Sequence, residues 1–519
     1  MPRFPVLYQL IVLSLLVKQA LCLSVSIPVA APSTAPTIAP DLVSLSIESD
    51  LWTDWTGTTS RNQFFFNTLQ NLINLTGKPP RFRLGGHSED NTNFSPNVQF
   101  FQASFPGFST STPYPEASNI VAGDGYYQAA QFLPPNTRIT WGMNLKENNL
   151  TAVFLETRSL MKAFASSAMK NAGVILDSIE VGNEADGFGL SLPTYIQQWE
   201  KIAQNITATA GLTKSSSTKL WGAAFAGSSH STSGFSPQSI IAQNILSSAA
   251  GSLITTMSGH RYSGSFCTGS GGLLQNLMDK ASIRGNLTSF NPDIAATKAK
   301  GLDYVMGETN SYACHGAPGV SNTAGAALWT LDYALFGPQI GISRLFFHQG
   351  VGYKYSMIQR VTLTRSPLDG STLSSPLPPH IQPQYYAAII AAEAIGNSGN
   401  TRAVEISINN SFISGYAFYV GNKLTKALFI NSQAFLTTSS GARGSTQITF
   451  GLTGSGAPTR MTVKRLSIPH ADATSGLTWG GQTFETSDGK VSGSVQVTTA
   501  NVSDGFSIQE TEAVLVTFQ

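Results

Sequence analysis

Hydrophobic and polar residues follow two different periods along this chain. Between about residue 41 and residue 394, short apolar runs of strand length alternate with amphipathic stretches of helical period. The predicted strands are 42–47, 81–85, 138–145, 177–182, 219–225, 254–261, 303–307 and 343–347, and the clearest predicted helices are 62–75, 151–171, 193–210 and 322–336. Eight strands with helices between them predict an α/β fold, a (β/α)8 TIM barrel.

A doubly wound open sheet is the main alternative for this region. Such a sheet ordinarily carries a glycine-rich phosphate-binding turn after its first strand. No turn of that kind occurs in the sequence. The pattern therefore favours the closed barrel.

The pattern changes near Gly396, where helical periodicity ends. Residues 395–519 consist of short alternating segments separated by clusters of Gly, Ser and Asn, which predicts a C-terminal antiparallel β-sandwich. Its terminal segment, 513–518, is apolar, so we expect it inside a sheet. One interpretation adds the Pro-rich segment 23–40 to this domain as an edge strand.

Composition and charge exclude several classes of partner. Charged residues make up 12% of the chain and the net charge is +2, with no basic run, so nucleic acid is not expected as a partner. Residues 1–22 read as a secretory signal peptide, with Arg3, an apolar core and a small residue before the expected cleavage point after Cys22. No later stretch has about 20 apolar residues. We expect a secreted, extracellular protein without a membrane span, and the sequence does not predict its oligomeric state.

Export changes how the remaining cysteines are interpreted. After cleavage only Cys267 and Cys314 remain, both just beyond predicted strand ends, and an oxidising compartment favours a disulfide between them. Two unrelated free thiols are the alternative. Asn-x-Ser/Thr sequons predict glycosylation at Asn74, Asn149, Asn205, Asn286, Asn409 and Asn501.

Two short strings carry the candidate chemistry. Val181-Gly182-Asn183-Glu184 and Val305-Met306-Gly307-Glu308 each end a β-branched or apolar run with glycine and a glutamate. By strand count they follow strands four and seven, whose carboxyl ends meet at one face of a barrel. Most glycosidases use two carboxylates that face one cavity as their catalytic residues. The alternative is a pair of unrelated surface glutamates.

Two neighbouring residues fit the same chemistry. Asn183 can donate its side-chain amide to a sugar 2-hydroxyl, a contact that strengthens as the ring gains oxocarbenium character. Tyr262, at the end of predicted strand six, can donate to Glu308 and keep that carboxylate ionised. A plain packing role is the alternative for Tyr262.

The motifs around these residues resemble a known family. Arg83-Leu84-Gly85-Gly86-His87-Ser88, Gly182-Asn183-Glu184-Ala185-Asp186 and Gly307-Glu308-Thr309-Asn310-Ser311 are similar to those of glycoside hydrolase family 79 in clan A, and the chain resembles secreted fungal-type exo-β-glucuronidases. The resemblance implies a barrel carrying a β-sandwich and hydrolysis with retention of configuration. It makes Glu184 the acid/base and Glu308 the nucleophile. Ala185 departs from the pattern, in which proline commonly follows the glutamate.

The resemblance also implies a substrate with a carboxylate at C5, recognised by neutral donors. The candidates are Tyr312 and the amides of Gly316 and Ala317 after strand seven, and Tyr353 and Tyr355 after strand eight. Ser88, Asp90 and Asn144 are candidate ligands for sugar hydroxyl groups. The substrate is then a glucuronic-acid-containing glycan or glycoside, including the 4-O-methyl form.

Some alternatives stay open at this point. An endo-acting heparanase-like or hyaluronan-type β-glucuronidase would need Lys and Arg along an open cleft, for which only Arg344, Arg360 and Arg365 near strand eight are available. A secreted carbohydrate-binding protein without catalysis is the non-enzyme alternative. The histidines fit no metal-ligand spacing, so we expect neither a metal nor a cofactor. The aromatic-rich loop 86–138 is expected to shape the aglycone side of the cleft.

Overall fold

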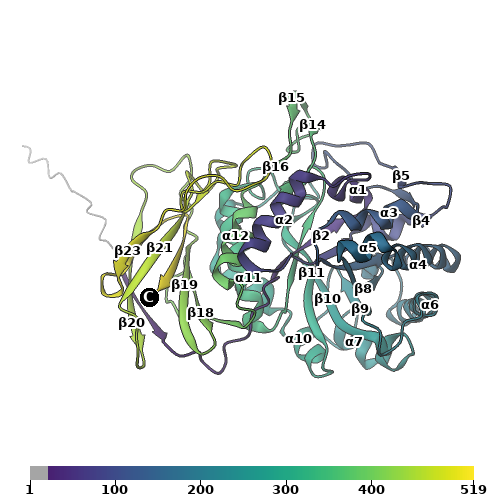
Figure 1. Cartoon of the computed structure of the whole chain (residues 1–519), viewed down its shortest axis with the longest axis horizontal. Helices are drawn as coiled ribbons and strands as arrows, with labels where there is room; N and C mark the ends of the chain where they lie inside the picture. Colours follow the sequence, from purple (N-terminus) through teal and green to yellow (C-terminus); the bar gives the residue numbers. More distant parts are fainter. Residues whose placement is uncertain (1–20) are drawn as a thin grey trace, which may run out of the picture.

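Eight parallel strands close into a barrel in the computed structural model, which describes residues 21–519 (Figure 1). In barrel order they are β2 (Val43–Glu48), β3 (Phe82–Gly85), β7 (Arg138–Met143), β8 (Ile175–Val181), β9 (Lys219–Phe225), β10 (Ile254–Ser265), β11 (Asp303–Ala313) and β12 (Leu345–Gln349). The predicted (β/α)8 barrel is confirmed. Because all neighbours are parallel, their carboxyl ends form a single mouth.

The main difference from the predicted strands lies in β10 and β11. Both continue several residues beyond the predicted ends, to Ser265 and Ala313, because they go on pairing with each other above the rim of the barrel. This extension carries the backbone from Glu308 toward Cys314. It also places residues of the sixth and seventh strands side by side over the mouth.

Helices surround the barrel, and each of the predicted helical segments forms one or two of them. They are α1 (Trp52–Thr56), α2 (Gln63–Thr76), α3 (Asp124–Gln128), α4 (Leu150–Ala165), α5 (Ser167–Ala172), α6 (Leu192–Ala210), α7 (Pro237–Ala242), α8 (Leu274–Met278), α9 (Lys280–Thr288), α10 (Asn291–Lys298), α11 (Ala324–Ile340) and α12 (Gln384–Ile395). The single helix expected over 151–171 is divided at Ser166, whose side chain caps α5 by accepting from the Met169 amide.

Two helices, α11 and α12, are apolar on all sides. Almost every residue of each is buried. They pack against each other and also contact β19 (Lys423–Asn431) of the C-terminal domain. A helix that is covered on both faces needs no polar side, which explains their lack of amphipathic pattern.

The C-terminal domain consists of two sheets packed beside the barrel (Figure 1). The larger sheet has the order β17 (Thr401–Glu405), β18 (Ile413–Val420), β19, β25 (Glu512–Phe518), β21 (Arg460–Ser467), β22 (Thr478–Trp479), with β23 (Thr498–Asn501) paired to β21. The terminal strand β25 therefore lies inside the sheet. The smaller sheet has the order β1 (Leu21–Pro28), β20 (Ser445–Thr453), β24 (Phe506–Gln509), and β1 runs parallel to β20 along all eight residues.

Two insertions in the loops after β3 and β12 add short strands at the mouth of the barrel. Between β3 and β7 the chain forms a small sheet of β4 (Thr92–Phe94), β6 (Asn119–Ala122) and β5 (Phe101–Ser104). After β12 it forms β13 (Ile358–Gln359), β14 (Leu363–Arg365), β15 (Thr372–Leu377) and β16 (His380–Ile381), and the β14–β15 hairpin projects from the molecule in Figure 1.

The predicted signal peptide lies almost wholly in residues 1–20, outside the described residues. Its last two residues, Leu21 and Cys22, begin β1. Cleavage after Cys22 would leave residues 23–28 of that strand. Among residues 21–519, no helix is long and apolar enough to cross a membrane.

Candidate active site

Glu184 is presented by a sharp turn at the end of the fourth barrel strand. After β8, Gly182 adopts a φ of 80° and Glu184 itself a φ of 53°, the left-handed region that a non-glycine residue seldom occupies. The Glu184 amide donates to the carbonyl oxygen of Ala224 at 2.8 Å, which holds the turn against β9. Strained backbone of this kind concentrates at functional sites. The Glu184 side chain is 35% exposed and points into the mouth.

Glu308 lies within β11, and its side chain is only 8% exposed. A β-bulge at Gly259/His260 shifts the register of β10, so that His260 pairs with Glu308. Bulges near active sites re-aim side chains in this way. One donor atom each of Glu184, His260 and Glu308 lies within 4.8 Å of the other two. An oxygen of each carboxylate therefore lies within 4.8 Å of an oxygen of the other, which suits the roughly 5–5.5 Å between the carboxyl groups of retaining glycosidases better than the roughly 6.5–9.5 Å of inverting ones.

Both oxygens of Glu308 accept strong hydrogen bonds. The Tyr262 hydroxyl donates to Oε1 at 2.6 Å, and the Arg83 guanidinium donates to Oε2 at 2.6 Å. Burial by itself would raise the pKa of Glu308, but His348, His260, Arg83 and the Tyr262 hydrogen bond together lower that pKa well below its usual range. Glu308 is therefore held in its ionised form at pH values at which an ordinary glutamate would take up a proton.

Two histidines link the carboxylates to the barrel wall. Nδ1 of His260 lies 3.0 Å from Oε1 of Glu184. Nδ1 of His348 lies 3.6 Å from Oε2 of Glu308, and its Nε2 lies 3.1 Å from Oε2 of Glu48. Although burial opposes it, the negative charge of Glu308 and the hydrogen bond to Glu48 raise the pKa of His348. A charged His348 adds to the positive field that keeps Glu308 ionised.

Arg83 is fully buried beneath the two carboxylates. Its guanidinium donates to Glu308, to Oε1 of Glu180 at 2.7 Å and to Oδ1 of Asn183 at 2.7 Å. Burial raises the pKa of the neighbouring Glu89 well above its usual range, and the charge of Glu180 raises it further. Arg83 makes its close ion pairs with Glu180 and Glu308 and lies 3.7 Å from Glu89.

The structure brings together four of the residues predicted from the sequence. Asn183 and Tyr262 both lie at the carboxylate pair. Asn183 accepts from Arg83 through Oδ1, which fixes the orientation of its amide and leaves the NH₂ group for a ligand. Tyr262 contacts Glu308 as expected. Glu184 and Glu308 complete the group.

Ser88, Asp90 and Asn144, which were predicted to bind sugar hydroxyl groups, instead make hydrogen bonds within the protein. Ser88 is bound to Glu48 and Ser49, and Asn144 donates to the Thr92 carbonyl while its own oxygen accepts from the Glu147 amide. Asp90 accepts from the backbone amides of Asn183, Leu145 and Lys146. All three side chains are buried and their polar groups are used within the protein. Ser88, Asp90 and Asn144 therefore position the loops of the site, because their hydrogen-bonding capacity is already taken up.

The loop after β11 also differs from expectation. The Gly316 amide donates to the Tyr312 carbonyl oxygen at 3.0 Å, and the Ala317 amide donates to Oγ of Ser321 at 2.9 Å. Both amides are thus engaged inside the loop. The Tyr312 ring packs against Gly264 and Gly272. These three candidates hold the loop in shape and are not placed to bind a substrate carboxylate.

Tyr353 and Tyr355, after β12, lie near the carboxylates. The Tyr355 ring centre is 5.9 Å from that of Tyr262, and the Tyr353 ring centre is 5.6 Å from that of Tyr355. Tyr353 also stacks on His315 with ring centres 3.8 Å apart. Both tyrosines therefore form the wall of the mouth next to Glu308.

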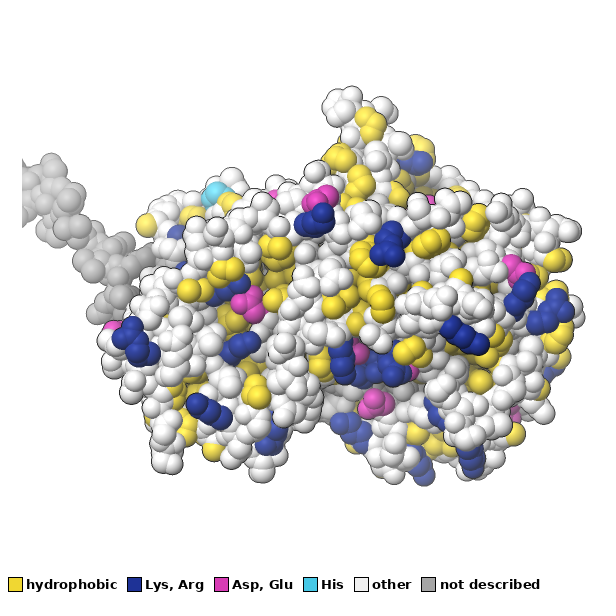
Figure 2. Space-filling view, in the orientation of Figure 1, with side chains coloured by type: hydrophobic (Ala, Val, Ile, Leu, Met, Phe, Trp, Pro, Cys, Tyr) yellow, Lys and Arg dark blue, Asp and Glu magenta, His cyan; other side chains and the backbone are white. Residues whose placement is uncertain are grey.

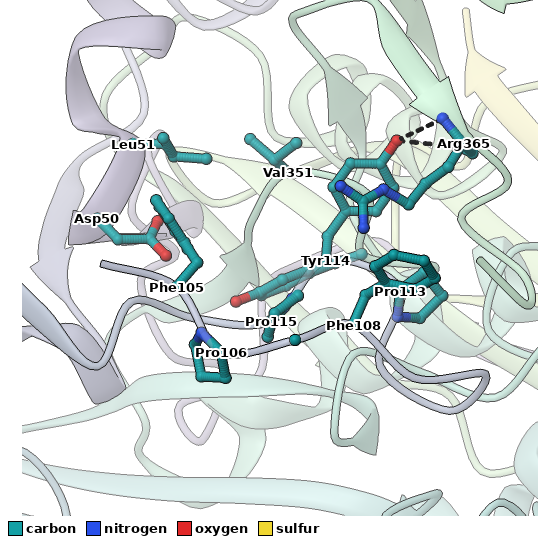
Figure 3. Close-up of a pocket in the computed structure, with 12 residues that line it drawn as sticks. Asp50, Leu51, Phe105, Pro106, Phe108, Pro113, Tyr114, Pro115, Val351 and Arg365 are labelled. Atoms are coloured by element: carbon teal, nitrogen blue, oxygen red, sulfur yellow. Dashed lines mark hydrogen bonds between the residues drawn. The ribbon is translucent and has the colours of Figure 1, made fainter. Parts of the chain in front are cut away.

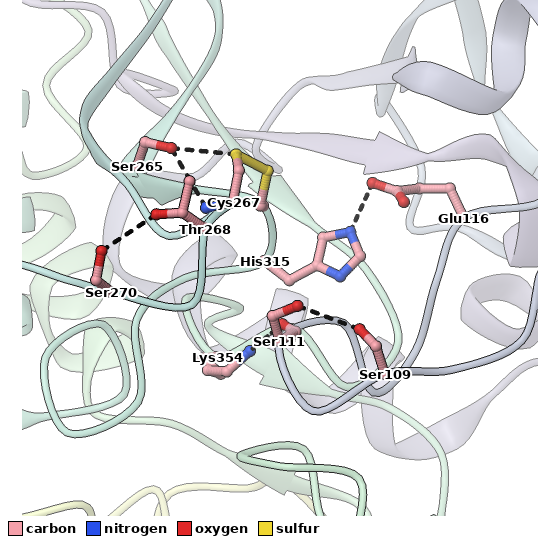
Figure 4. The surroundings of a disulfide bond; sticks show 10 residues. Ser109, Ser111, Glu116, Ser265, Cys267, Thr268, Ser270, His315 and Lys354 are labelled. Carbon is pink, nitrogen blue, oxygen red and sulfur yellow. Dashed lines mark hydrogen bonds and ion pairs between the residues drawn. A yellow bond between two sulfur atoms is a disulfide. The ribbon is translucent and has the colours of Figure 1, made fainter.

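The predicted disulfide between Cys267 and Cys314 is present (Figure 4). It joins the extended ends of β10 and β11. Cys314 and His315 both have positive φ, so the bridge fixes a strained turn. Nε2 of His315 lies 2.5 Å from Oε1 of Glu116, which ties this turn to the insertion after β3. The positive field of His315 overcomes the effect of burial and lowers the pKa of Glu116 to about 2.

Sequence reasoning did not assign Arg83, His260 and His348 to the site. A usable signal existed for Arg83, because a charged residue inside an otherwise apolar central strand must be paired. The histidines follow apolar runs in the same way as the glutamates do. What the sequence could not show is the bulge that turns His260 toward Glu184.

The predicted glycosylation sites lie at the surface to different degrees. Asn74, Asn149, Asn409 and Asn501 are exposed, whereas Asn205 and Asn286 are half-buried. The Asn149 side chain caps α4, and the Asn286 side chain accepts from Arg261.

The group of Glu184, His260 and Glu308 has the composition of a metal site, so its fit needs testing. Both Glu308 oxygens already accept donors, one of them from a guanidinium whose charge repels a cation. The donor set therefore suits proton transfer and nucleophilic chemistry better than metal binding.

Comparisons with known proteins agree with this site. Residues 415–515 match the model of the glycosyl hydrolase family 79 C-terminal beta domain. A beta-glucuronidase of Neurospora crassa is 28% identical, over 85% of this chain and 84% of its own length, and a beta-glucuronidase of Aspergillus niger is 28% identical, over 85% and 82%.

The fold has a solved counterpart. The crystal structure of a 4-O-alpha-L-rhamnosyl-beta-D-glucuronidase from Fusarium oxysporum superposes with a TM-score of 0.77 at 24% identity, covering 96% of this chain and all of the other. Barrel, β domain and the paired glutamates at the mouth thus occur together in one chain. Residues 415–515 match the C-terminal beta domain of glycoside hydrolase family 79, and the chain as a whole is similar to two fungal beta-glucuronidases.

Proposed function

We propose that this protein is a retaining exo-β-glucuronidase, which hydrolyses terminal β-linked glucuronic acid, including its 4-O-methyl form, from glycans or glycosides. The observation that carries the proposal is the approach of Glu184 and Glu308 within 4.8 Å across the barrel mouth. The β-glucuronidases of Neurospora crassa and Aspergillus niger, which match most of this chain, support the choice of sugar.

The first half of the reaction forms a covalent intermediate. The ionised Glu308 attacks the anomeric carbon, and a protonated Glu184 gives its proton to the glycosidic oxygen, so that the leaving group departs as an alcohol. The exposure of Glu184 and the burial of Glu308 suit these roles, since the acid must reach the leaving group and the nucleophile must be fixed.

The second half releases the sugar. Glu184, now ionised, removes a proton from a water molecule, and the resulting hydroxide attacks the anomeric carbon and displaces Glu308. Two inversions give net retention. His260, hydrogen-bonded to Glu184, holds that carboxylate in position for both proton transfers.

The surroundings of Glu308 prepare it for attack. Tyr262, Arg83 and His348 stabilise its charge before substrate binds. Glu308 loses its negative charge when it forms the ester bond to the sugar. The same donors stabilise the carboxylate again when that bond breaks in deglycosylation. The NH₂ group of Asn183 is available to the 2-hydroxyl group of the sugar.

The carboxylate of the glucuronic acid would accept hydrogen bonds from uncharged hydroxyl groups. The side chains of Tyr353 and Tyr355 lie in the wall beside Glu308, and their hydroxyl groups are the candidates that remain after Tyr312, Gly316 and Ala317 are set aside. Neutral donors would bind this second negative charge without neutralising Glu308.

The positions of the arginines favour exo over endo action. Arg344 precedes β12 at the amino end of the barrel and pairs with Asp41, and Arg360 is buried with its guanidinium 4.0 Å from the Trp55 ring. Neither lines the mouth, and of the three arginines considered only Arg365 lines the pocket beside Tyr353. On the face shown in Figure 2, Lys and Arg side chains are spread in small groups over the surface. A polyanion would be held poorly by such a distribution. A non-catalytic sugar-binding role would leave the charge arrangement around Glu308 unused.

We further propose that the protein is secreted and glycosylated. The predicted signal peptide, the disulfide and four exposed sequons support this assignment.

The test compares an aryl β-D-glucuronide with the matching aryl β-D-glucoside. We expect turnover of the glucuronide, little turnover of the glucoside, and β-glucuronic acid as the first product in proton NMR. Appearance of the α-anomer first would contradict double displacement. Preference for the glucoside would contradict the choice of sugar.

A further inference from the structure

A cavity also lies at the end of the barrel opposite the catalytic mouth. The cavity at the mouth, drawn in Figure 3, is lined by residues 105–108 of the aromatic-rich loop and by Tyr353 from the wall beside Glu308. The cavity at the opposite end has a volume of about 370 Å³, within the roughly 300–1,000 Å³ usual for small-molecule sites. The reaction proposed above makes no use of it.

The lining of this cavity comes from segments that meet at the amino ends of the barrel strands. Arg81 and Arg344 each stand one residue before a strand, β3 and β12, and Arg138 is the first residue of β7. Residues 37–41, before β2, and residues 77–79, after α2, close its sides. Because the strands are all parallel, a ligand bound here lies at the other end of the barrel from the carboxylates of the mouth.

Positive charge is concentrated in the lining. Its charged side chains are four basic ones and one acidic one: Lys78, Arg81, Arg138, Arg344 and Asp41. Asp177, which pairs with Arg81 and Arg138, still leaves the basic groups in excess by two. Residues 21–519 as a whole carry equal numbers of basic and acidic side chains, because the chain has 31 Lys and Arg against 29 Asp and Glu, and Arg3 and Lys18 lie in residues 1–20. The excess is therefore a local feature of this cavity.

Two of the arginines share Asp41 and keep donors free. Nε of Arg81 donates to Oδ2 of Asp41 at 2.8 Å, and Nε of Arg344 donates to Oδ1 at 3.0 Å. Both Nη groups of Arg344, and Nη2 of Arg81, have no hydrogen-bond partner among residues 21–519. Burial and the charge of Arg81 lower the pKa of Arg344, although Asp41 opposes this shift. An anion beside the two guanidinium groups would relieve their repulsion.

We propose that this cavity is a second, non-catalytic binding site for an oxyanion, either the carboxylate of a sugar acid or a phosphate group. Free guanidinium N–H groups match the oxygens of both. The exposed side chains of Thr37 and Asn136 offer neutral polar groups to the rest of a ligand. Because a bound anion would join segments 37–41 and 77–79 to the barrel, binding stabilises the folded protein and leaves catalysis unchanged.

Calorimetric titration of the full protein with sodium phosphate and with sodium D-glucuronate tests this site. At constant ionic strength we expect saturable binding of phosphate, a higher melting temperature, and unchanged kcat and KM for p-nitrophenyl β-D-glucuronide. Phosphate that raises KM as a competitive inhibitor would bind at the mouth and overturn the assignment. Absence of saturable binding of either anion would also overturn it.

Two variants locate the binding. Lys78→Gln/Arg138→Gln removes two charges from the cavity wall at exposed positions. We expect Kd for phosphate to rise at least roughly tenfold, the change that loss of one charge-assisted hydrogen bond brings. Arg344→Lys keeps a charge beside Asp41 but removes the free Nη groups, so it should weaken binding as well. Both variants should retain the kcat of the unaltered protein.

A control variant and the second anion complete the test. Arg460→Gln/Lys490→Gln removes the same charge from exposed positions of the C-terminal domain and should leave Kd unchanged. Equal weakening in this control would show general attraction of anions in place of a site. Glucuronate also binds at the mouth as the reaction product, so the cavity variants decide its place. Weaker glucuronate binding in them identifies a sugar acid as the ligand, weaker phosphate binding alone identifies a phosphate, and no change for either anion overturns the proposal.

Discussion

The hydroxyl group of Tyr262 lies 2.6 Å from Oε1 of Glu308, across the pair of strands β10 and β11. The phenol donates and the carboxylate accepts, because burial and the charge of Glu308 raise the pKa of Tyr262 well above its usual value. This hydrogen bond is made to the charged form of Glu308. It therefore lowers the pKa of that carboxyl group.

Tyr262→Phe removes this hydrogen bond and should raise the pKa of Glu308. Activity on the acidic side requires ionised Glu308, so the acidic limb of the kcat/KM profile should move to higher pH, while the alkaline limb stays in place. Tyr304→Phe, a buried tyrosine at the amino end of β11 whose hydroxyl has no hydrogen-bond partner among the described residues, serves as control. An unshifted acidic limb in Tyr262→Phe would show that the hydrogen bond does not tune the nucleophile.

Glu308→Ala should reduce turnover of every glucuronide by on the order of 10⁴-fold or more, because no other group can form the covalent intermediate. Added azide should restore turnover of an activated aryl glucuronide and give the α-glucuronyl azide, since azide then attacks directly from the face that Glu308 occupied. Formation of the β-azide would instead identify Glu308 as the acid/base.

Glu184→Ala should discriminate between leaving groups. The alcohol leaving group of an alkyl glucuronide must be protonated, so kcat/KM for such substrates should fall roughly 10²–10⁴-fold. Dinitrophenolate departs without a proton, so kcat/KM for a dinitrophenyl glucuronide should fall far less. Azide should give the β-azide here. If both substrates lose activity equally, Glu184 does not act as the general acid.

Arg83→Met should both destabilise the protein and lower kcat. It leaves Glu180 and Glu308 buried without their common partner, and breaking a buried pair in this way costs about 3–5 kcal/mol. The free energy of unfolding in urea measures this cost. Arg81→Met is the control, because Arg81 lies two residues earlier on the same segment, is 23% exposed and pairs with Asp41 and Asp177 at the amino end of the barrel. We expect a smaller loss of stability there and an unchanged kcat.

Reduction of the Cys267–Cys314 bridge should lower the melting temperature. With a sequence separation of 47 between the cysteines, the restriction of chain entropy in the unfolded state gives about 4 kcal/mol as the full contribution of the bridge. The double variant Cys267→Ser/Cys314→Ser should melt at the temperature of the reduced protein. Thiol titration of the unfolded, unreduced protein should find no thiol if residues 1–22 are removed and one, from Cys22, if they are retained.

Much of the architecture was predictable because it depends on local pattern. Short apolar runs of strand length predicted the eight strands, a period of 3.6 residues predicted helices between them, and the segment 219–225 agrees with β9 at both ends. The division at Ser166 was missed because helical periodicity continues across it while a local side-chain cap starts a new helix. The long ends of β10 and β11 were missed because they exist only through their pairing.

The sequence by itself determined the two glutamates, Tyr262, the disulfide partners and the terminal strand inside the sheet, since each follows from a residue type at a strand end or from compartment and patterning. Only the tertiary structure decided which polar residues face a ligand. The side chains of Asp90 and Asn144 bond to backbone groups and that of Ser88 bonds to Glu48 and Ser49, whereas Arg83 crosses the barrel to reach Glu308. The physical reason is that a buried polar group must be satisfied, and its partner is set by strands that are distant in sequence.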